Sequence, residues 1–191
     1  MHYFLNQRIL TSILTCALLA AILRPARADK PNFVFVISDD QRWDTLGAAG
    51  NRAIHTPNLD KMAESGVYFR QATIHVTQCS PSRAMLLTGM SPFATGWLSN
   101  QYQEDHVKSA DGFRHYPLLP ALLRDAGYST VLCGKWHLDP MPWNCGFTHL
   151  PLWMPQGSDV YKNAPLAEGK SSQTTIHTGY VNGLFCDEAI R

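Results

Sequence analysis

The sequence has few charged residues and no surplus of either sign. Asp, Glu, Lys and Arg make up 16% of its 191 residues, below the quarter that is typical of globular domains, and the formal net charge is +1. Residues 29–191 carry 13 Lys or Arg residues against 15 Asp or Glu residues, so the basic field that nucleic-acid binding requires is absent. Hydrophobic residues make up 45%, which argues against intrinsic disorder and favours one domain with a hydrophobic core.

The N-terminal segment lacks an apolar run long enough to span a bilayer. Residues 9–23 form a run of 15 apolar-weighted residues, whereas a spanning helix needs about 20. Arg8 precedes this run and the triplet Ala26-Arg27-Ala28 follows it, which is typical of a secretory signal peptide. We therefore expect cleavage near Ala28 and export of residues 29–191 to the periplasm or the medium, with no stable membrane anchor.

Cysteine is also scarce. The five cysteines become four when residues 1–28 are removed, namely Cys79, Cys133, Cys145 and Cys186. An even number of cysteines in an oxidising compartment would allow two disulfides, and their pairing stays open at this point.

Strand and helix signals alternate along the rest of the chain. Residues 33–37 form an unbroken β-branched and aromatic run that predicts a strand buried on both faces, and 67–69 and 128–133 predict two more strands. Thr56, Pro57 and Gly66 delimit one predicted helix, and further helices are predicted at 82–88, 120–126 and 180–191. Residues 139–173 are rich in Pro, Gly and Trp and predict a surface insertion or a pocket wall. This alternation predicts an α/β fold with ligands beyond the carboxyl ends of the strands.

Two blocks of sequence carry the most informative chemistry. The pentapeptide Cys79-Ser80-Pro81-Ser82-Arg83 follows a loop and opens a predicted helix, and Gly127 to His137 ends in Gly-Lys-Trp-His. Both blocks resemble the signatures of the type I, formylglycine-dependent sulfatases, and residues 31–40 and 56–60 are similar to that family as well. The resemblance implies an alkaline-phosphatase-like α/β fold, with a mostly parallel sheet flanked by helices.

The resemblance also implies that Cys79 is oxidised to formylglycine by a maturation enzyme that reads Cys-x-Pro-x-Arg in the unfolded chain. The hydrated aldehyde attacks sulfur with one hydroxyl and expels the alcohol, and deprotonation of the second hydroxyl then releases sulfate. Cys79 leaves the pool of cysteines available for disulfides, so Cys133, Cys145 and Cys186 can form at most one pair within the chain.

The other candidate site residues suit a highly charged transfer. Asp39 and Asp40 follow the first predicted strand and offer oxygen ligands to Ca²⁺, or to Mg²⁺, with the diol at Cys79 as a further ligand. Arg83 lies one helical turn after Cys79. Lys135 would hold sulfate oxygens, and His137 would orient or deprotonate a hydroxyl of the diol. Taken singly, each residue has an alternative interpretation. Asp39 and Asp40 could be loop caps, Arg83 part of a surface ion pair, Lys135 a surface lysine and His137 a packed histidine.

We therefore interpret residues 29–191 as the N-terminal part of a sulfatase catalytic domain that cleaves sulfate esters, with sulfated carbohydrates the favoured substrates. Family members continue well beyond this length with further metal ligands and a second lysine, so we expect this chain to be inactive alone. Two alternatives remain. One is a phosphate or phosphonate ester hydrolase of the same superfamily, and the other is a catalytically silent domain that binds sulfated glycans.

Overall fold

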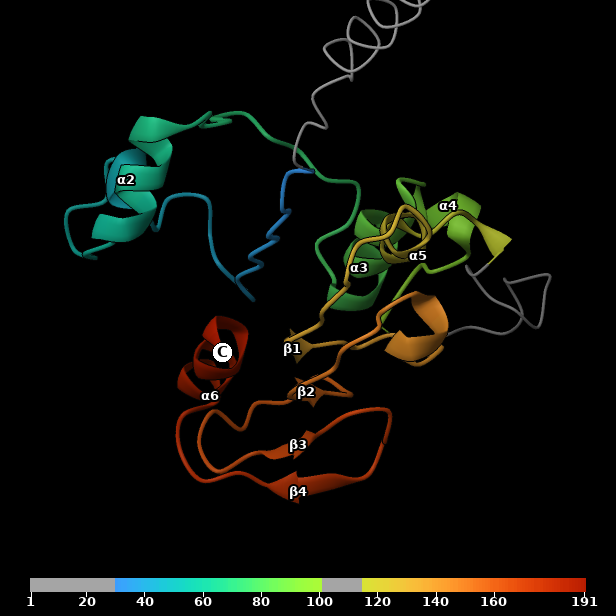
Figure 1. The fold of residues 1–191 in the computed structure, drawn as a ribbon. Coiled ribbons are helices and arrows are strands. Elements are labelled where there is room, and N and C mark those ends of the chain that lie inside the picture. Colours follow the sequence, from blue (N-terminus) through green and yellow to red (C-terminus); the bar gives the residue numbers. More distant parts are fainter. Residues whose placement is uncertain (1–29, 101–114) are drawn as a thin grey trace, which may run out of the picture. The chain divides into compact units, whose positions relative to one another are not determined.

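A computed structural model describes residues 30–100 and 115–191, in two compact units that divide after Asp40 (Figure 1). The predicted signal peptide, residues 1–28, lies outside the described residues. Within the described ranges, no helix has both the length and the apolar character needed to cross a membrane.

The first unit contributes residues 30–40 to the described structure, and they form no helix or strand. The strand predicted at 33–37 is therefore wrong, and Val34 in this run is 83% exposed. A strand exists only when its backbone groups pair with a neighbouring strand. Apolar character alone does not supply that neighbour.

The second unit contains helices close to the predicted ones. They are α2 at Pro57–Ser65, α3 at Cys79–Thr88, α4 at Pro92–Thr95, α5 at Leu119–Asp125 and α6 at Val181–Ile190, with 3₁₀ turns η1 at Gly47–Ala49 and η4 at Pro142–Cys145. Pro57 stands at the start of α2 and Gly66 at its end, as predicted. Gly89 ends α3 in the left-handed conformation with φ +68°, which a residue without Cβ adopts freely. The helix signals of the sequence are thus confirmed.

Four short strands form one mixed sheet in the order β1-β2-β3-β4 (Figure 1). They are β1 at Gly134–Lys135, β2 at Trp153–Met154, β3 at Pro165–Ala167 and β4 at Thr174–Ile176. β1 and β2 are parallel, whereas β2 with β3 and β3 with β4 are antiparallel. The described sheet therefore has one parallel pairing rather than the mostly parallel set that was expected.

The strand predicted at 128–133 is displaced along the chain, because regular pairing begins only at Gly134. Val131 makes an isolated bridge with His149, and Thr130 Oγ1 donates to the carbonyl of Gly146 at 2.6 Å. This stretch is therefore held by the Thr130 side chain and by single backbone hydrogen bonds, such as that from the Leu132 N–H to the His149 carbonyl at 3.1 Å, where a continuous ladder was expected. The short strand predicted at 67–69 is absent, and Phe69 is exposed.

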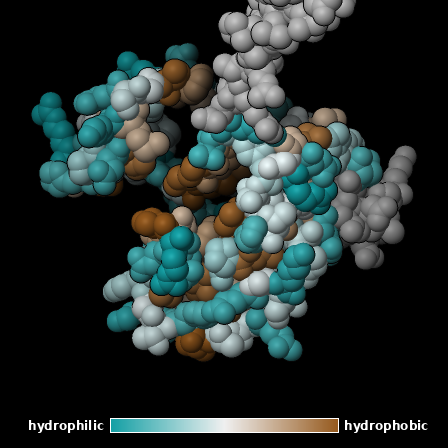
Figure 2. Space-filling view, in the orientation of Figure 1, coloured by the Kyte–Doolittle hydropathy of each residue, from teal (hydrophilic) through white to brown (hydrophobic). Residues whose placement is uncertain are grey.

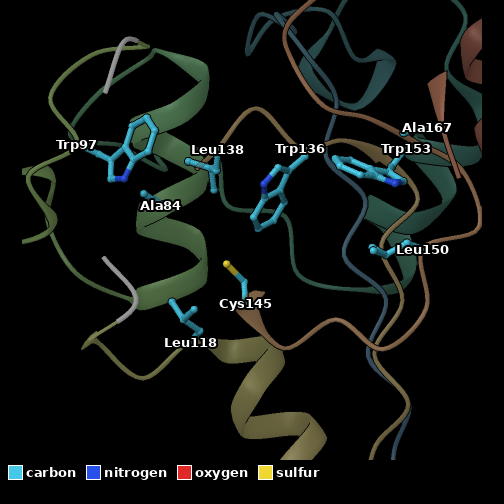
Figure 3. Packing of buried hydrophobic residues seen from close by; sticks show 9 residues of the cluster. All are labelled: Ala84, Trp97, Leu118, Trp136, Leu138, Cys145, Leu150, Trp153 and Ala167. Carbon is cyan, nitrogen blue, oxygen red and sulfur yellow. The ribbon is translucent and has the colours of Figure 1, made fainter. Parts of the chain in front are cut away.

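The core of the second unit is built around tryptophans. Figure 3 shows Trp136 between Leu138 and Trp153, in a cluster whose buried members are Ala84, Trp97, Leu118, Trp136, Leu138, Cys145, Leu150, Trp153 and Ala167. Residues 139–173 were expected to be a surface insertion or a pocket wall, and the first alternative is wrong because they supply β2, β3 and the fully buried Trp153. The Trp and Leu side chains of this segment bury large apolar areas, which outweighs its lack of periodicity.

A second hydrophobic cluster packs helix α6 against the sheet. Leu152, Met154, Ala164, Leu166 and Val181 are buried in it, and Cys133, Leu184 and Phe185 pack against it. Other apolar side chains remain at the surface, as Figure 2 shows for one face, and Ile190 at the end of α6 is 85% exposed.

The fold predicts an unusually costly substitution at Gly146. This buried residue has φ +104°, and a Cβ would lie 2.3 Å from the backbone nitrogen of Ala121. We expect Gly146→Ala to lower the free energy of unfolding by more than about 3 kcal/mol, because helix α5 must move. Gly89→Ala is the control, with φ +68° and open space around its Cβ, and should cost about 1–2 kcal/mol. Urea denaturation measures both, and equal losses would contradict the close approach.

Candidate active site

The first turn of α3 carries the signature cysteine. α3 begins at Cys79, three residues before the predicted start, with Gln78 as its N-cap residue. Pro81 fits this turn because the first N–H groups of a helix have no partner within the helix. Cys79 is half-buried, whereas Ser80 next to it is fully buried. The signature therefore stands at a helix N-terminus, where the partial positive charge of the helix favours anions.

Lys135 brings a positive charge to Cys79. It is the second residue of β1, and its Nζ donates to Cys79 Sγ at 3.2 Å. The two residues are 56 positions apart in the sequence, so only the packing of α3 against the end of β1 brings them together. The structure thus joins two of the predicted site residues in one contact.

Arg83 lies one turn further along α3, and its Nη1 donates to the carbonyl of Lys135 at 2.8 Å. The guanidinium therefore binds the backbone of the residue whose side chain contacts Cys79. A guanidinium keeps its charge at any physiological pH. Arg83 and Lys135 together give the first turn of α3 two cationic groups and suit it to an anionic ligand.

His137 follows β1 after the buried Trp136. Trp136 packs into the core and is 3% exposed. The backbone leaves the extended conformation at His137, whose φ is +55°. Its carbonyl accepts a hydrogen bond of 2.7 Å from Ser80 Oγ, so the backbone of His137 lies beside the residue that follows Cys79.

Three residues of this region could not be identified as site residues from the sequence. Ser80 ties α3 to His137, Asn100 Oδ1 accepts the Ser80 N–H at 3.1 Å, and Gly157 lies against the His137 imidazole. Ser80 occupies the variable position of Cys-x-Pro-x-Arg, which hides its role. Asn100 and Gly157 belong to irregular stretches with no pattern that could reveal them.

Asp39 and Asp40 close the first unit, which is described by itself. Both are exposed, and Asp40 has φ +53°, so the chain turns there rather than leaving a regular strand. Adjacent carboxylates are the hard oxygen donors that Ca²⁺ prefers. Within residues 30–100 and 115–191, no group of three or more His, Cys, Asp or Glu side chains comes together as a metal site. The role of Asp39 and Asp40 as metal ligands therefore stays a prediction.

Cys133 and Cys186 lie outside the signature. Cys133 and Cys186 are free thiols, so the structure does not pair them. Burial raises the pKa of the Cys133 thiol above its usual value. A raised pKa keeps this thiol protonated at neutral pH, and it is therefore a poor nucleophile.

Known proteins resemble the chain in both sequence and structure. The family model described as Sulfatase matches residues 31–188. N-acetylgalactosamine-6-sulfatase of Mus musculus is 37% identical over 142 residues, which are 71% of this chain and 26% of the relative. N-acetylglucosamine-6-O-sulfatase of Bacteroides thetaiotaomicron is 30% identical over 176 residues, which are 90% of this chain and 29% of the relative.

A solved structure supports the same relationship. A protein in complex with its substrate D-glucosamine-2-N,6-O-disulfate superposes with a TM-score of 0.69 and 28% identity, over 85% of this chain and 31% of that protein. The predicted sulfatase-type α/β fold is thereby confirmed. The chain spans less than a third of the length of these relatives. Because the family model matches most of its residues, the chain belongs to the sulfatase family.

Proposed function

We propose that this chain supplies the nucleophile-bearing part of a sulfatase active site that hydrolyses sulfate esters. The observation that carries the proposal is the 3.2 Å contact between Lys135 Nζ and Cys79 Sγ at the start of α3. It places the amino group of Lys135 next to the side chain of the signature cysteine. We further propose that a maturation enzyme converts Cys79 to formylglycine, whose hydrate supplies a hydroxyl nucleophile.

The cationic residues would bind the sulfate group. Lys135 stands at residue 79 and would neutralise charge that builds on the sulfate oxygens as the ester bond breaks. Arg83 holds the Lys135 carbonyl at 2.8 Å and adds a second positive charge to the same turn. The N-terminus of α3 contributes its dipole to the same region.

His137 would accept or orient a proton of the hydroxyl groups at residue 79. Its carbonyl accepts a hydrogen bond from Ser80 Oγ at 2.7 Å, so its backbone lies beside the turn that carries residue 79. An imidazole changes its protonation state near neutral pH. We assign it the orientation or deprotonation of a hydroxyl at residue 79, the step that leads to release of sulfate.

Asp39 and Asp40 would supply carboxylate ligands to a divalent cation, Ca²⁺ or Mg²⁺. The bound ion would supply positive charge that lowers the cost of ionising a hydroxyl. Two carboxylates favour Ca²⁺, which accepts irregular oxygen coordination more readily than Mg²⁺ does.

Sulfated carbohydrates are the proposed substrates. The two curated relatives are named for 6-sulfated N-acetylgalactosamine and N-acetylglucosamine, and the solved structure holds a disulfated glucosamine. The signal-peptide pattern around Arg8 and Ala28 supports the further proposal that the protein acts after export.

Cys79 tests the proposal directly. When the chain is produced in a host that contains a formylglycine-generating enzyme, the peptide containing residue 79 should be about 18 Da lighter than its thiol form, because a thiol becomes an aldehyde. Mass spectrometry of a tryptic digest measures this change. Cys145 lies outside any Cys-x-Pro-x-Arg sequence and its peptide should keep the thiol mass. Full retention of the thiol at residue 79 would refute the conversion.

The metal pair can be tested by binding. In the protein expressed from its complete gene, Asp39→Asn and Asp40→Asn should each weaken Ca²⁺ affinity by more than about tenfold, because each removes a charged ligand. Asp125→Asn is the matched control, since Asp125 pairs with Arg124 on the surface. Isothermal titration calorimetry measures the affinities. If both site variants keep the wild-type Ca²⁺ affinity, Asp39 and Asp40 are loop caps and not metal ligands.

Substrate selectivity separates sulfatase activity from the alternatives. The same protein, matured at residue 79, should cleave an aryl sulfate with a higher kcat/KM than an aryl phosphate or phosphonate. Cys79→Ala should lower kcat for the aryl sulfate by at least about 10⁴-fold, whereas Cys186→Ala, at an exposed thiol, should leave it unchanged. Faster phosphate cleavage would favour the phosphohydrolase alternative. Binding of sulfated glycans without turnover would favour the silent domain.

A further inference from the structure

The backbone of His137 is held from both sides. Its N–H donates to the carbonyl of Pro155 at 3.0 Å, and its carbonyl accepts from the buried Ser80 Oγ at 2.7 Å. Its φ of +55° lies in the left-handed region. Residues other than glycine rarely adopt this backbone conformation, and surrounding contacts must hold them in it. With the backbone fixed in this way, the imidazole can move only by rotation about its own side-chain bonds.

The imidazole of His137 lies against the backbone of Gly157. A Cβ at Gly157 would lie 2.7 Å from Cε1 of the ring, 3.1 Å from Nδ1 and 3.4 Å from Nε2. Carbon atoms in contact prefer separations of about 3.5–4.0 Å. The ring therefore occupies the space that the smallest side chain at residue 157 would need.

Backbone conformation does not explain why residue 157 is glycine. Its φ lies outside the left-handed region that favours glycine, so alanine can adopt the same backbone there. The residue is also exposed, so no close packing in the core demands a small residue. The ring of His137 is the neighbour that a side chain at residue 157 would meet.

We infer that Gly157 is a positioning residue for His137. The missing side chain leaves room for the imidazole beside residue 157, and any side chain at this position rotates the ring away. The consequence for catalysis rests on the proposed function, under which His137 handles a proton at residue 79. The contact between Gly157 and the ring is independent of that function.

The first test observes the ring itself. In ¹⁵N-histidine-labelled protein expressed from its complete gene, Gly157→Ala should shift the imidazole signals of His137 in a long-range ¹H–¹⁵N spectrum. Gly183→Ala is the matched control, because a Cβ at Gly183 meets open space on α6. It should leave the His137 signals in place. Unshifted His137 signals in Gly157→Ala would overturn the inference.

A second measurement guards against simple misfolding. If the ring causes the conflict, any loss of thermal stability in Gly157→Ala should disappear when the ring is removed, so His137→Ala/Gly157→Ala should melt at the temperature of His137→Ala. A loss that persists in the double variant would overturn the inference, because the conflict would then involve another group.

Kinetics tests the consequence for catalysis. With matured protein and an aryl sulfate, Gly157→Ala should lower kcat by about 10²-fold, because misplacement of a catalytic group by about 1 Å has an effect of this size. KM should change little, and the limb of the pH profile that reports the histidine should shift. Wild-type kcat in Gly157→Ala would overturn the positioning role. If the wild-type protein has no sulfatase turnover, the proposed function fails, and the imidazole signals still decide whether Gly157 positions the ring.

Discussion

The hydrogen bond between Ser80 Oγ and the His137 carbonyl is the contact on which the arrangement of the candidate site depends. It is 2.7 Å long, its serine is fully buried, and it joins residues 57 positions apart. Loss of such a bond leaves a hydrogen-bonding group without its partner at a partly buried position, which costs about 1–3 kcal/mol when the group is buried. The bond fixes the first turn of α3 against the chain that leaves β1. The contacts from Lys135 to Cys79 and from Arg83 to Lys135 follow from that placement.

Hydrophobic packing keeps Ser80 and the His137 carbonyl within hydrogen-bonding distance. Trp136 lies between the two residues that face the site, and its indole packs edge-on against Phe147 at 5.8 Å between ring centroids. Its Nε1 donates to the Pro140 carbonyl at 3.0 Å. One buried ring therefore sets the position of Lys135 before it and His137 after it, which couples the tryptophan-rich core to the chemistry at the helix start.

The site concentrates positive charge where an anion would bind. Lys135, Arg83 and the N-terminus of α3 converge on one turn, and placing like charges together in a partly buried region is unfavourable without an anion to balance them. The anionic group of a sulfate ester would supply that balance. This local excess of positive charge suits the first turn of α3 to an anionic ligand.

The sequence alone determined the family, the helices and the chemical types at the site. Helix ends were predictable because Pro57, Gly66 and Gly89 act locally, through restricted or unusual backbone angles. Strands were not predictable in the same way. The apolar run at 33–37 forms no strand and pairing begins only at Gly134, because a strand depends on partners that are remote in the sequence.

Only the tertiary structure decided which site residues meet. Cys79 and Lys135 come into contact across 56 positions, and the roles inferred for Ser80 and Gly157 depend on a carbonyl and a ring that lie far away in the chain. A serine at a variable position and a glycine in an irregular stretch carry no local pattern. Their importance arises from packing, which places distant groups within hydrogen-bonding and van der Waals distance.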